Sequence, residues 1–333
     1  MLGTIGPHWD GNEVWLLTAG GATFAAFPEW YGTLFSGAYL VLLLILLCLI
    51  VRICAIEWRE KINDQAWRDR WDWAHTISAW TPSILWGAAF ANLVQGMRIE
   101  VIDTASGAPV PASEVPTDVL IHGASHQITG GFLSLLTPFT LLGGAVTCLL
   151  FLTHGALYIA LKTAGPLSER ALRLAKRSSI ASAAVTAVWA LWAQLAHSSN
   201  ALAWIPLVIA ALALIGSLGL ARQDRIGWAF ALHFVGIAFA VVFIFAAMAP
   251  DVMRSSIDAA YSLTIQQAAS ADTTLLIMTV AAVVFVPVVL FYTIWGYRVF
   301  SKRISAEAID PHEGGLHPTR VRDSAQPEAV IGY

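Results

Sequence analysis

Long stretches without a charged side chain constrain this chain more than any other feature of its sequence. An α-helix rises 1.5 Å per residue, so roughly 20 apolar residues cross the ~30 Å hydrocarbon layer of a bilayer. Six uncharged stretches reach that length, namely residues 31–51, 74–97, 133–161, 178–221, 226–250 and 273–297. The stretch 178–221 has about twice that length and is interrupted at 197–200, so it predicts two spans. A shorter span from Asp10 to Pro28 brings the expected total to eight.

Composition excludes several classes of protein. Hydrophobic residues make up 57% of the chain and charged residues 12%, whereas a soluble domain has roughly 25% charged residues. The net charge of −3 provides no basic field for nucleic acid. The three cysteines, Cys48, Cys54 and Cys148, form neither a CxxC pair nor a cluster with histidine. We therefore expect an all-α polytopic membrane protein without a disulfide framework or a thiolate metal site.

The distribution of basic residues predicts the orientation in the membrane. Cytoplasmic loops of membrane proteins are enriched in Lys and Arg. Of the 19 Lys and Arg residues, 17 lie in 52–73, 162–177, 222–225 and after 297, and the alternate loops are rich in Asp and Glu. Both termini are therefore expected in the cytoplasm. No basic segment or small-residue cleavage site precedes Gly6, so we expect no cleavable signal peptide.

The spacing of the spans predicts two helix bundles. Short connections favour antiparallel neighbours, and a long connection at 98–132 divides the spans into two groups. The last residues are rich in Pro, Gly and charge, a composition that cannot bury enough apolar surface to order itself. The expected organisation is a first bundle at 1–97, an extracytoplasmic loop at 98–132, a second four-helix bundle at 133–250, an outer loop with a peripheral last helix at 251–300, and a flexible cytoplasmic tail at 301–333.

Charged groups near the start of the first span are the first functional candidates. Asp10 and Glu13 lie where the helix dipole and free N–H groups favour a carboxylate. Asp10 is interpreted either as an N-cap or as a proton carrier. If the first two spans form a short antiparallel pair, Asp10 and Arg52 lie at one depth, with Glu57 just beyond. Carboxylates there could exchange protons with the cytoplasm while Arg52 stays charged.

Histidines and one tryptophan leave further alternatives open. His154 and His233 lie within spans and could ligate a haem iron or serve as packing residues. His122 and His126 form an i, i+4 pair with no carboxylate nearby in sequence to complete a metal site, and we expect them at the surface. Trp15 lies inside the first span, where it could line an internal passage or pack in the core.

A family resemblance is carried by motifs along most of the chain. They are GPHWDGNEVWLLTAGGA at 6–22, FAAFP at 24–28, FSG at 35–37, LWGAAFAN at 85–92, THGA at 153–156, and Val286-Pro287 before Tyr292. Together they closely resemble subunit II of the cytochrome bd quinol oxidases, from the start of the chain to about Arg303. In that family a further transmembrane helix normally precedes the first motif, and we expect the first bundle of this chain to lack it.

The resemblance implies a role in a larger complex. A homologous subunit I would hold haems b and d and oxidise quinol, and the complex would reduce dioxygen to water in the bacterial inner membrane. Subunit II would bind no haem or metal and would carry no catalytic residue. It would stabilise the assembly, contribute to proton and oxygen pathways, and be able to hold a structural quinone. Small accessory membrane subunits can join such a complex.

The resemblance also assigns roles to four residues. Asp10 falls on the aspartate of the family's proton path, and Arg52 and Glu57 fall on charged positions close to it. Trp15 falls on the tryptophan beside the oxygen passage. Two other classes of protein remain open. A proton-coupled transporter fits eight spans but requires a buried charge at midplane, and a membrane cytochrome would bind its own haem through His154 or His233.

Overall fold

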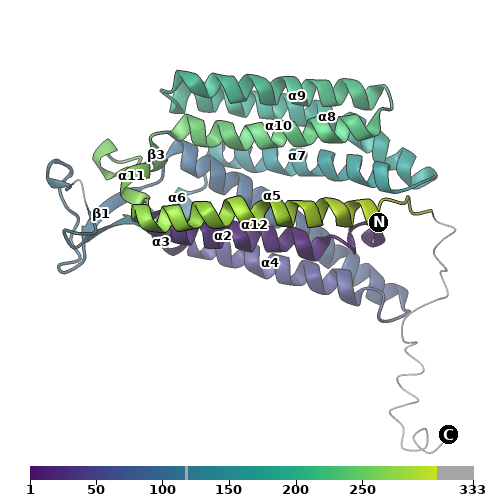
Figure 1. The fold of residues 1–333 in the computed structure, drawn as a ribbon, viewed down its shortest axis with the longest axis horizontal. Coiled ribbons are helices and arrows are strands. Elements are labelled where there is room, and N and C mark those ends of the chain that lie inside the picture. The colour runs from purple at the N-terminus through teal and green to yellow at the C-terminus, as the bar shows by residue number, and fades with distance from the viewer. Residues whose placement is uncertain (117–118, 306–333) are drawn as a thin grey trace, which may run out of the picture.

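Helices lying side by side make up almost all of the computed structural model, which describes residues 1–116 and 119–305 (Figure 1). The helices are α1 (Leu2–Ile5), α2 (Trp9–Ala26), α3 (Pro28–Gly37), α4 (Tyr39–Trp58), α5 (Gln65–Gln95), α6 (Gly131–Ser134), α7 (Pro138–Lys162), α8 (Pro166–Trp192), α9 (Trp204–Arg222), α10 (Ile226–Met248), α11 (Ile265–Ala268) and α12 (Asp272–Val299). Short helical turns are η1 (Ala112–Glu114), η2 (Ala193–His197), η3 (Ala201–Ala203) and η4 (Ala259–Tyr261), and the strands are β1 (Ile99–Asp103), β2 (Ala124–Ile128), β3 (Asp251–Met253) and β4 (Leu263–Thr264).

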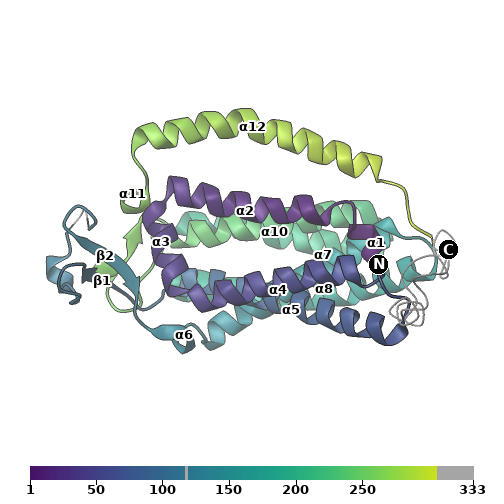
Figure 2. The ribbon, with the colours of Figure 1, turned by 90° about the horizontal axis from the view of Figure 1, so that it is seen from below.

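The predicted fold class, an all-α polytopic membrane protein, is confirmed. Within the described ranges, six helical segments are long and apolar enough to cross a membrane: Tyr39–Trp58, Pro138–Lys162, Pro166–His197, Ala201–Arg222, Ile226–Met248 and Asp272–Val299. Two further long helices, α2 and α5, contain charged residues near one end and lie alongside these six (Figure 2). We interpret α2 and α5 as spans as well, which gives the expected eight.

Local sequence explains where two of the long helices begin. Asp64 precedes α5, and its carboxylate accepts a hydrogen bond of 2.8 Å from the backbone N–H of Trp67. Thr137 precedes α7 and forms a reciprocal capping box with Thr140, with Pro138 at the first helical position. Such caps satisfy the free N–H groups of the first turn.

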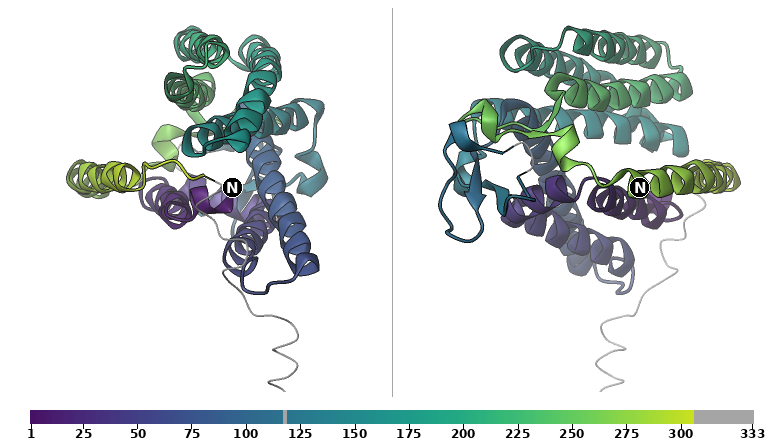
Figure 3. Two further views of the ribbon diagram at one scale, coloured as in Figure 1. Left: turned by 90° about the vertical axis from the view of Figure 1, so that its right-hand side faces the viewer. Right: turned by 60° about the vertical axis from the view of Figure 1, so that its left-hand side comes forward.

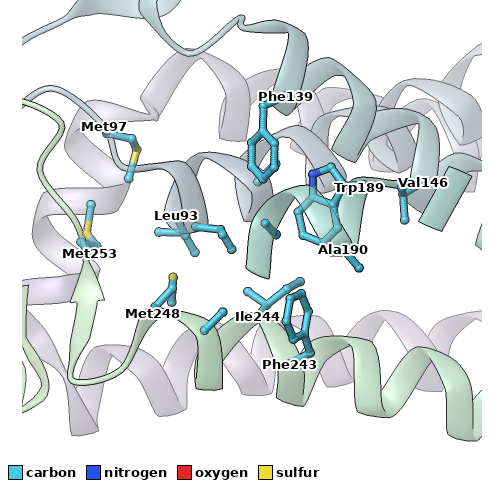
Figure 4. Packing of buried hydrophobic residues seen from close by; sticks show 14 of the residues in the cluster. Leu93, Met97, Phe139, Val146, Trp189, Ala190, Phe243, Ile244, Met248 and Met253 are labelled. Atoms are coloured by element: carbon cyan, nitrogen blue, oxygen red, sulfur yellow. The ribbon is translucent and has the colours of Figure 1, made fainter. Parts of the chain in front are cut away.

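A continuous apolar core connects the early and late helices. The helix pairs α4 and α5, α5 and α7, α7 and α8, and α9 and α10 pack along their lengths. Leu93 of α5, Phe139 of α7, Trp189 of α8 and Phe243 of α10 meet in this core, where the rings of Phe139 and Trp189 stack at 5.4 Å (Figure 4). Helix α5, from the predicted first bundle, packs directly on α7, from the predicted second bundle. The division of the chain into two bundles remains a proposal.

The last helix, α12, lies at the edge of the molecule and has no buried residue (Figure 2). At one end, Ser270 donates hydrogen bonds to the carbonyl groups of Ala25 and Ala26 at 2.6 and 2.8 Å. At the other end, the ring of Tyr297 stacks on His8 with centroids 4.0 Å apart. These contacts connect α12 to both ends of α2.

The segment predicted as a long extracytoplasmic loop contains an antiparallel hairpin. Strands β1 and β2 pair from Ile99 with Ile128 to Asp103 with Ala124, and Figure 3 shows this hairpin beyond one end of the helices. Val101, Val119 and Tyr261 form a small core beneath it. The predicted flexible tail lies outside the described residues from 306 onward, and before that point the N–H of Ile304 donates to the carbonyl of Lys162.

Candidate functional site

An ion pair joins α2 to α4. The start of α2 and the end of α4 lie at the end of the molecule opposite the hairpin (Figure 1). The guanidinium of Arg52, near the end of α4, donates to the carboxylate of Glu13 in the first half of α2. Their side chains are 30% and 17% exposed. Charge-assisted bonds of this kind are roughly twice as strong as neutral ones. The structure therefore brings Arg52 to Glu13, which lies one helical turn further along α2 than Asp10.

Asp10 and Glu57 lie apart from this ion pair. Helix α2 begins at Trp9 with His8 as its N-cap residue, so Asp10 belongs to the first turn and does not cap the helix. The side chains of Asp10 and Glu57 are exposed, and in the described part of the chain neither makes a hydrogen bond or an ion pair. The capping interpretation of Asp10 is therefore wrong for this helix.

A short helix separates the two helices that carry Asp10 and Arg52. The sequence predicted a direct antiparallel pair of spans that turns at Glu29 and Trp30. In the structure, α3 (Pro28–Gly37) lies between α2 and α4, and α4 begins only at Tyr39 (Figure 2). The chain therefore passes from α2 to α4 through a helix of 10 residues and not through the direct turn that was predicted.

A second ion pair connects α4 to α5. Arg59 donates from Nε to Oδ1 of Asp72 at 2.6 Å and from Nη2 to Oδ2 at 2.9 Å. Because the Asp72 side chain is 49% exposed, solvent limits the contribution of the pair to stability to about 0.2–1 kcal/mol.

His75 lies one turn beyond Asp72 on α5 and was not recognised from the sequence. Its side chain is half-buried. Nδ1 of His75 and Nε of Arg52 are buried, and neither has a hydrogen-bond partner among the described residues. The two ion pairs, Arg52 with Glu13 and Arg59 with Asp72, join α4 to α2 and to α5.

Trp15 lies on α2, half-buried, and α2 has no fully buried residue. In the described part of the chain its ring makes no stacked or edge contact with another aromatic ring. Trp15 thus lies on a helix without a fully buried residue. Its role, either to line an internal passage or to pack in the core, stays a prediction.

The two histidines considered as haem ligands lie close together on α7 and α10. The rings of His154 and His233 stack with centroids 5.4 Å apart, and the other neighbour of His154 is the ring of Phe230 at 4.3 Å. Two axial ligands approach a haem iron from opposite sides through ring nitrogens. Rings stacked face to face at this distance leave no room for a porphyrin between them, so this pair does not fit a haem.

His126 was predicted at the surface, and this prediction is wrong. Its imidazole is fully buried, and Nδ1 lies 2.7 Å from a carboxylate oxygen of Glu29 on α3. Thr33, one turn along α3, donates to the backbone carbonyl of His126 at 3.1 Å. The partner carboxylate is 97 residues away in the chain. Inspection of nearby residues could not find it.

Comparison with known proteins identifies the family. Residues 1–300 match the family described as "Cytochrome bd terminal oxidase subunit II". The chain belongs to this family. Two curated relatives agree with the match. "Cytochrome bd ubiquinol oxidase subunit 2" of Bacillus subtilis is 35% identical over 309 residues, which cover 92% of this chain and 85% of the relative.

The second relative is "Cytochrome bd-I ubiquinol oxidase subunit 2" of Escherichia coli K12. It is 34% identical over 350 aligned positions, which cover 95% of this chain and 87% of the relative. The resemblance inferred from the motifs is therefore confirmed. This subunit II chain is part of a terminal oxidase of the cytochrome bd type, a complex that contains haem.

Proposed function

We propose that this chain is the haem-free subunit of a bacterial quinol:dioxygen oxidoreductase. Its partner, cytochrome bd subunit I, holds haems b and d and oxidises quinol, and the complex reduces dioxygen to water. The chain is not active alone. The observation that carries this proposal is the family match over residues 1–300. The stacked arrangement of His154 and His233, which does not fit a haem, supports it.

The orientation is proposed from charge. The end of the helices that carries Arg52, Arg59 and Lys162 lies in the cytoplasm, since basic residues are enriched there. The β1–β2 hairpin then lies outside, and the C-terminus is cytoplasmic. Helices α2 and α12, which have no buried residue, face the partner, lipid, a structural quinone or small accessory subunits.

The proton path is proposed to begin at this cytoplasmic end. Glu57 and Asp10 are exposed carboxylates that can take up protons from water. Arg52 remains charged and favours the ionised form of a neighbouring carboxylate. Trp15, about one turn beyond Asp10 on α2, is proposed to border the oxygen passage.

Co-production with the partner subunit tests the function. Membranes containing both subunits should consume oxygen when supplied with quinol, and membranes in which only this chain is omitted should not. Reintroduction of the chain should restore the activity. Full quinol oxidase activity of the partner without this chain would contradict the proposal.

A further inference from the structure

We propose that Tyr297, near the end of α12, is a positioning residue for proton uptake, because it holds the start of α2 and with it Asp10. The inference rests on the proposed function of Asp10 and adds a residue from the far end of the chain. It is carried by the contacts of Tyr297 with His8 and Asn12 and by the anchoring of α12 beside α7.

Tyr297 contacts α2 before and after Asp10. Its ring stacks on the imidazole of His8 with centroids 4.0 Å apart and planes inclined by 15°. Its hydroxyl lies 3.4 Å from the side-chain nitrogen of Asn12. His8 is the N-cap residue of α2, and the N–H of Asn12 donates to the carbonyl of His8 at 3.1 Å. One side chain of α12 therefore holds both ends of the first turn of α2.

The helical period places Asp10 away from this contact. Residues four apart lie on one face of a helix, whereas residues two apart point in roughly opposite directions, because each residue turns the helix by about 100°. His8 and Asn12 therefore face α12, and Asp10 lies on the other side of the first turn. The Asp10 side chain is exposed. Tyr297 thus fixes the backbone that carries Asp10 and leaves the carboxylate free to exchange protons with water.

The first turn of α2 needs such support. The first four N–H groups of a helix have no partner within it, and helix ends fray. His8 makes no side-chain capping bond, and α2 has no fully buried residue. The ion pair of Glu13 with Arg52 holds α2 only about one turn after Asp10. Without Tyr297 we expect the start of α2 to fray and Asp10 to move.

Tyr297 is itself anchored to the other helices. Nζ of Lys162, the last residue of α7, donates to the carbonyl of Phe300, just beyond the end of α12. The N–H of Ile304 donates to the carbonyl of Lys162 at 2.9 Å, and the carbonyl of Ile304 accepts from the N–H of Ala164 at 3.1 Å. These bonds hold the end of α12 against the connection between α7 and α8. A fixed α12 can therefore hold the less well packed start of α2.

The stack joins two uncharged rings. Burial, and then the positive charge of Lys162, lower the pKa of His8, so its imidazole is neutral near neutral pH. Titration of His8 would therefore change the rate only in acid. A loss of proton uptake at Asp10 is expected instead at high pH, where protons are scarce.

The experiment uses the complete complex with Tyr297→Ala, Tyr297→Phe and Tyr292→Ala. Tyr297→Ala should keep the haem spectrum, while quinol-driven oxygen consumption falls by about two- to tenfold at high pH, the factor that the energy of one aromatic pair represents, and less at low pH. Tyr297→Phe keeps a ring on His8 and should recover most of the rate. Tyr292→Ala is the matched control and should leave the rate unchanged, because among the described residues the ring of Tyr292 pairs only with that of Trp295 on the same helix.

A double variant separates positioning from stability. If Tyr297 acts through Asp10, Tyr297→Ala should add nothing to Asp10→Asn, and the double variant should be as slow as Asp10→Asn alone. A merely structural role would give a loss that is equal at every pH and that multiplies the loss in Asp10→Asn. Either of these results, or normal turnover of Tyr297→Ala, would overturn the inference.

The remaining outcomes separate this inference from the proposed function. If Tyr297→Ala does not assemble, His8→Ala, which removes the same stack from the side of α2, takes its place with the same readouts; failure of both to assemble would show a structural role and overturn the inference. If Asp10→Asn is slow and Tyr297→Ala is normal, the proposed proton path stands and this inference fails. If Asp10→Asn is normal at every pH, the proposed role of Asp10 fails, and the inference fails with it.

Discussion

A close approach of α5 and α7 predicts a strong effect of a single methyl group. At Gly87 of α5, an added Cβ would overlap with Oγ1 of Thr147 and with the backbone carbonyl of Gly143, both on α7. At Gly143 an added Cβ would lie 2.6 Å from Cβ of Ala91. Small residues on both helices therefore allow the backbones to pack directly, as is common in membrane helix pairs.

The expected loss of stability in Gly87→Ala has two contributions. Overpacking in a well-packed core costs about 1–3 kcal/mol. Separation of the helices would also weaken the 2.6 Å hydrogen bond from Thr147 to the carbonyl of Ser83, and such bonds between membrane helices contribute about 0.6–1.7 kcal/mol. The sum is roughly 2–5 kcal/mol, which corresponds to a factor of at least tenfold in an equilibrium constant.

The assay is the temperature at which the purified complex loses half of its quinol oxidase activity. Gly87→Ala should lower this temperature or prevent assembly. Gly155→Ala, on the facing helix α7, is the matched control, because an added Cβ there has no neighbour within 4 Å. Equal heat resistance of the Gly87 variant, the Gly155 variant and the unmodified complex would refute the close packing of α5 against α7.

Three further predictions concern single side chains. Asp10→Asn should keep the haem spectrum of the complex while oxygen consumption falls most steeply at high pH, where protons are scarce; normal turnover at every pH would exclude a proton role for Asp10. Trp15→Ala should raise the oxygen concentration needed for half-maximal rate, and an unchanged value would argue against an oxygen passage there. Glu29→Ala leaves His126 buried without its carboxylate partner and should destabilise the hairpin by about 1–3 kcal/mol, seen as faster proteolysis between residues 98 and 132; equal proteolysis would count against the pair.

The spans could be predicted from the sequence because uncharged length is a local property. Three helices show this: nearly all of the apolar part of α4 lies in the stretch 31–51, that of α10 in 226–250, and that of α12 in 273–297. The first strand of the hairpin also has a local pattern in the sequence. Residues 99–103, Ile-Glu-Val-Ile-Asp, begin with the alternation of apolar and polar residues typical of a half-buried strand.

The candidate site could be predicted only in part, because its pairs depend on register between helices. The sequence indicated that Arg52 approaches a carboxylate of α2, but α3 lies between α2 and α4, and the partner of Arg52 is Glu13. His75 stands alone in an apolar stretch of α5. Its half-buried position follows from the packing of α5 against its neighbours.

The most direct test of the account is the location of the haem. This chain, carrying an affinity tag, should be purified from membranes once with and once without its partner subunit, and the reduced-minus-oxidised absorption spectrum should be recorded for equal amounts of chain. The account predicts haem bands and quinol-driven oxygen consumption only when the partner copurifies. Stoichiometric haem bound to the chain alone, and lost in His154→Ala or His233→Ala, would contradict it.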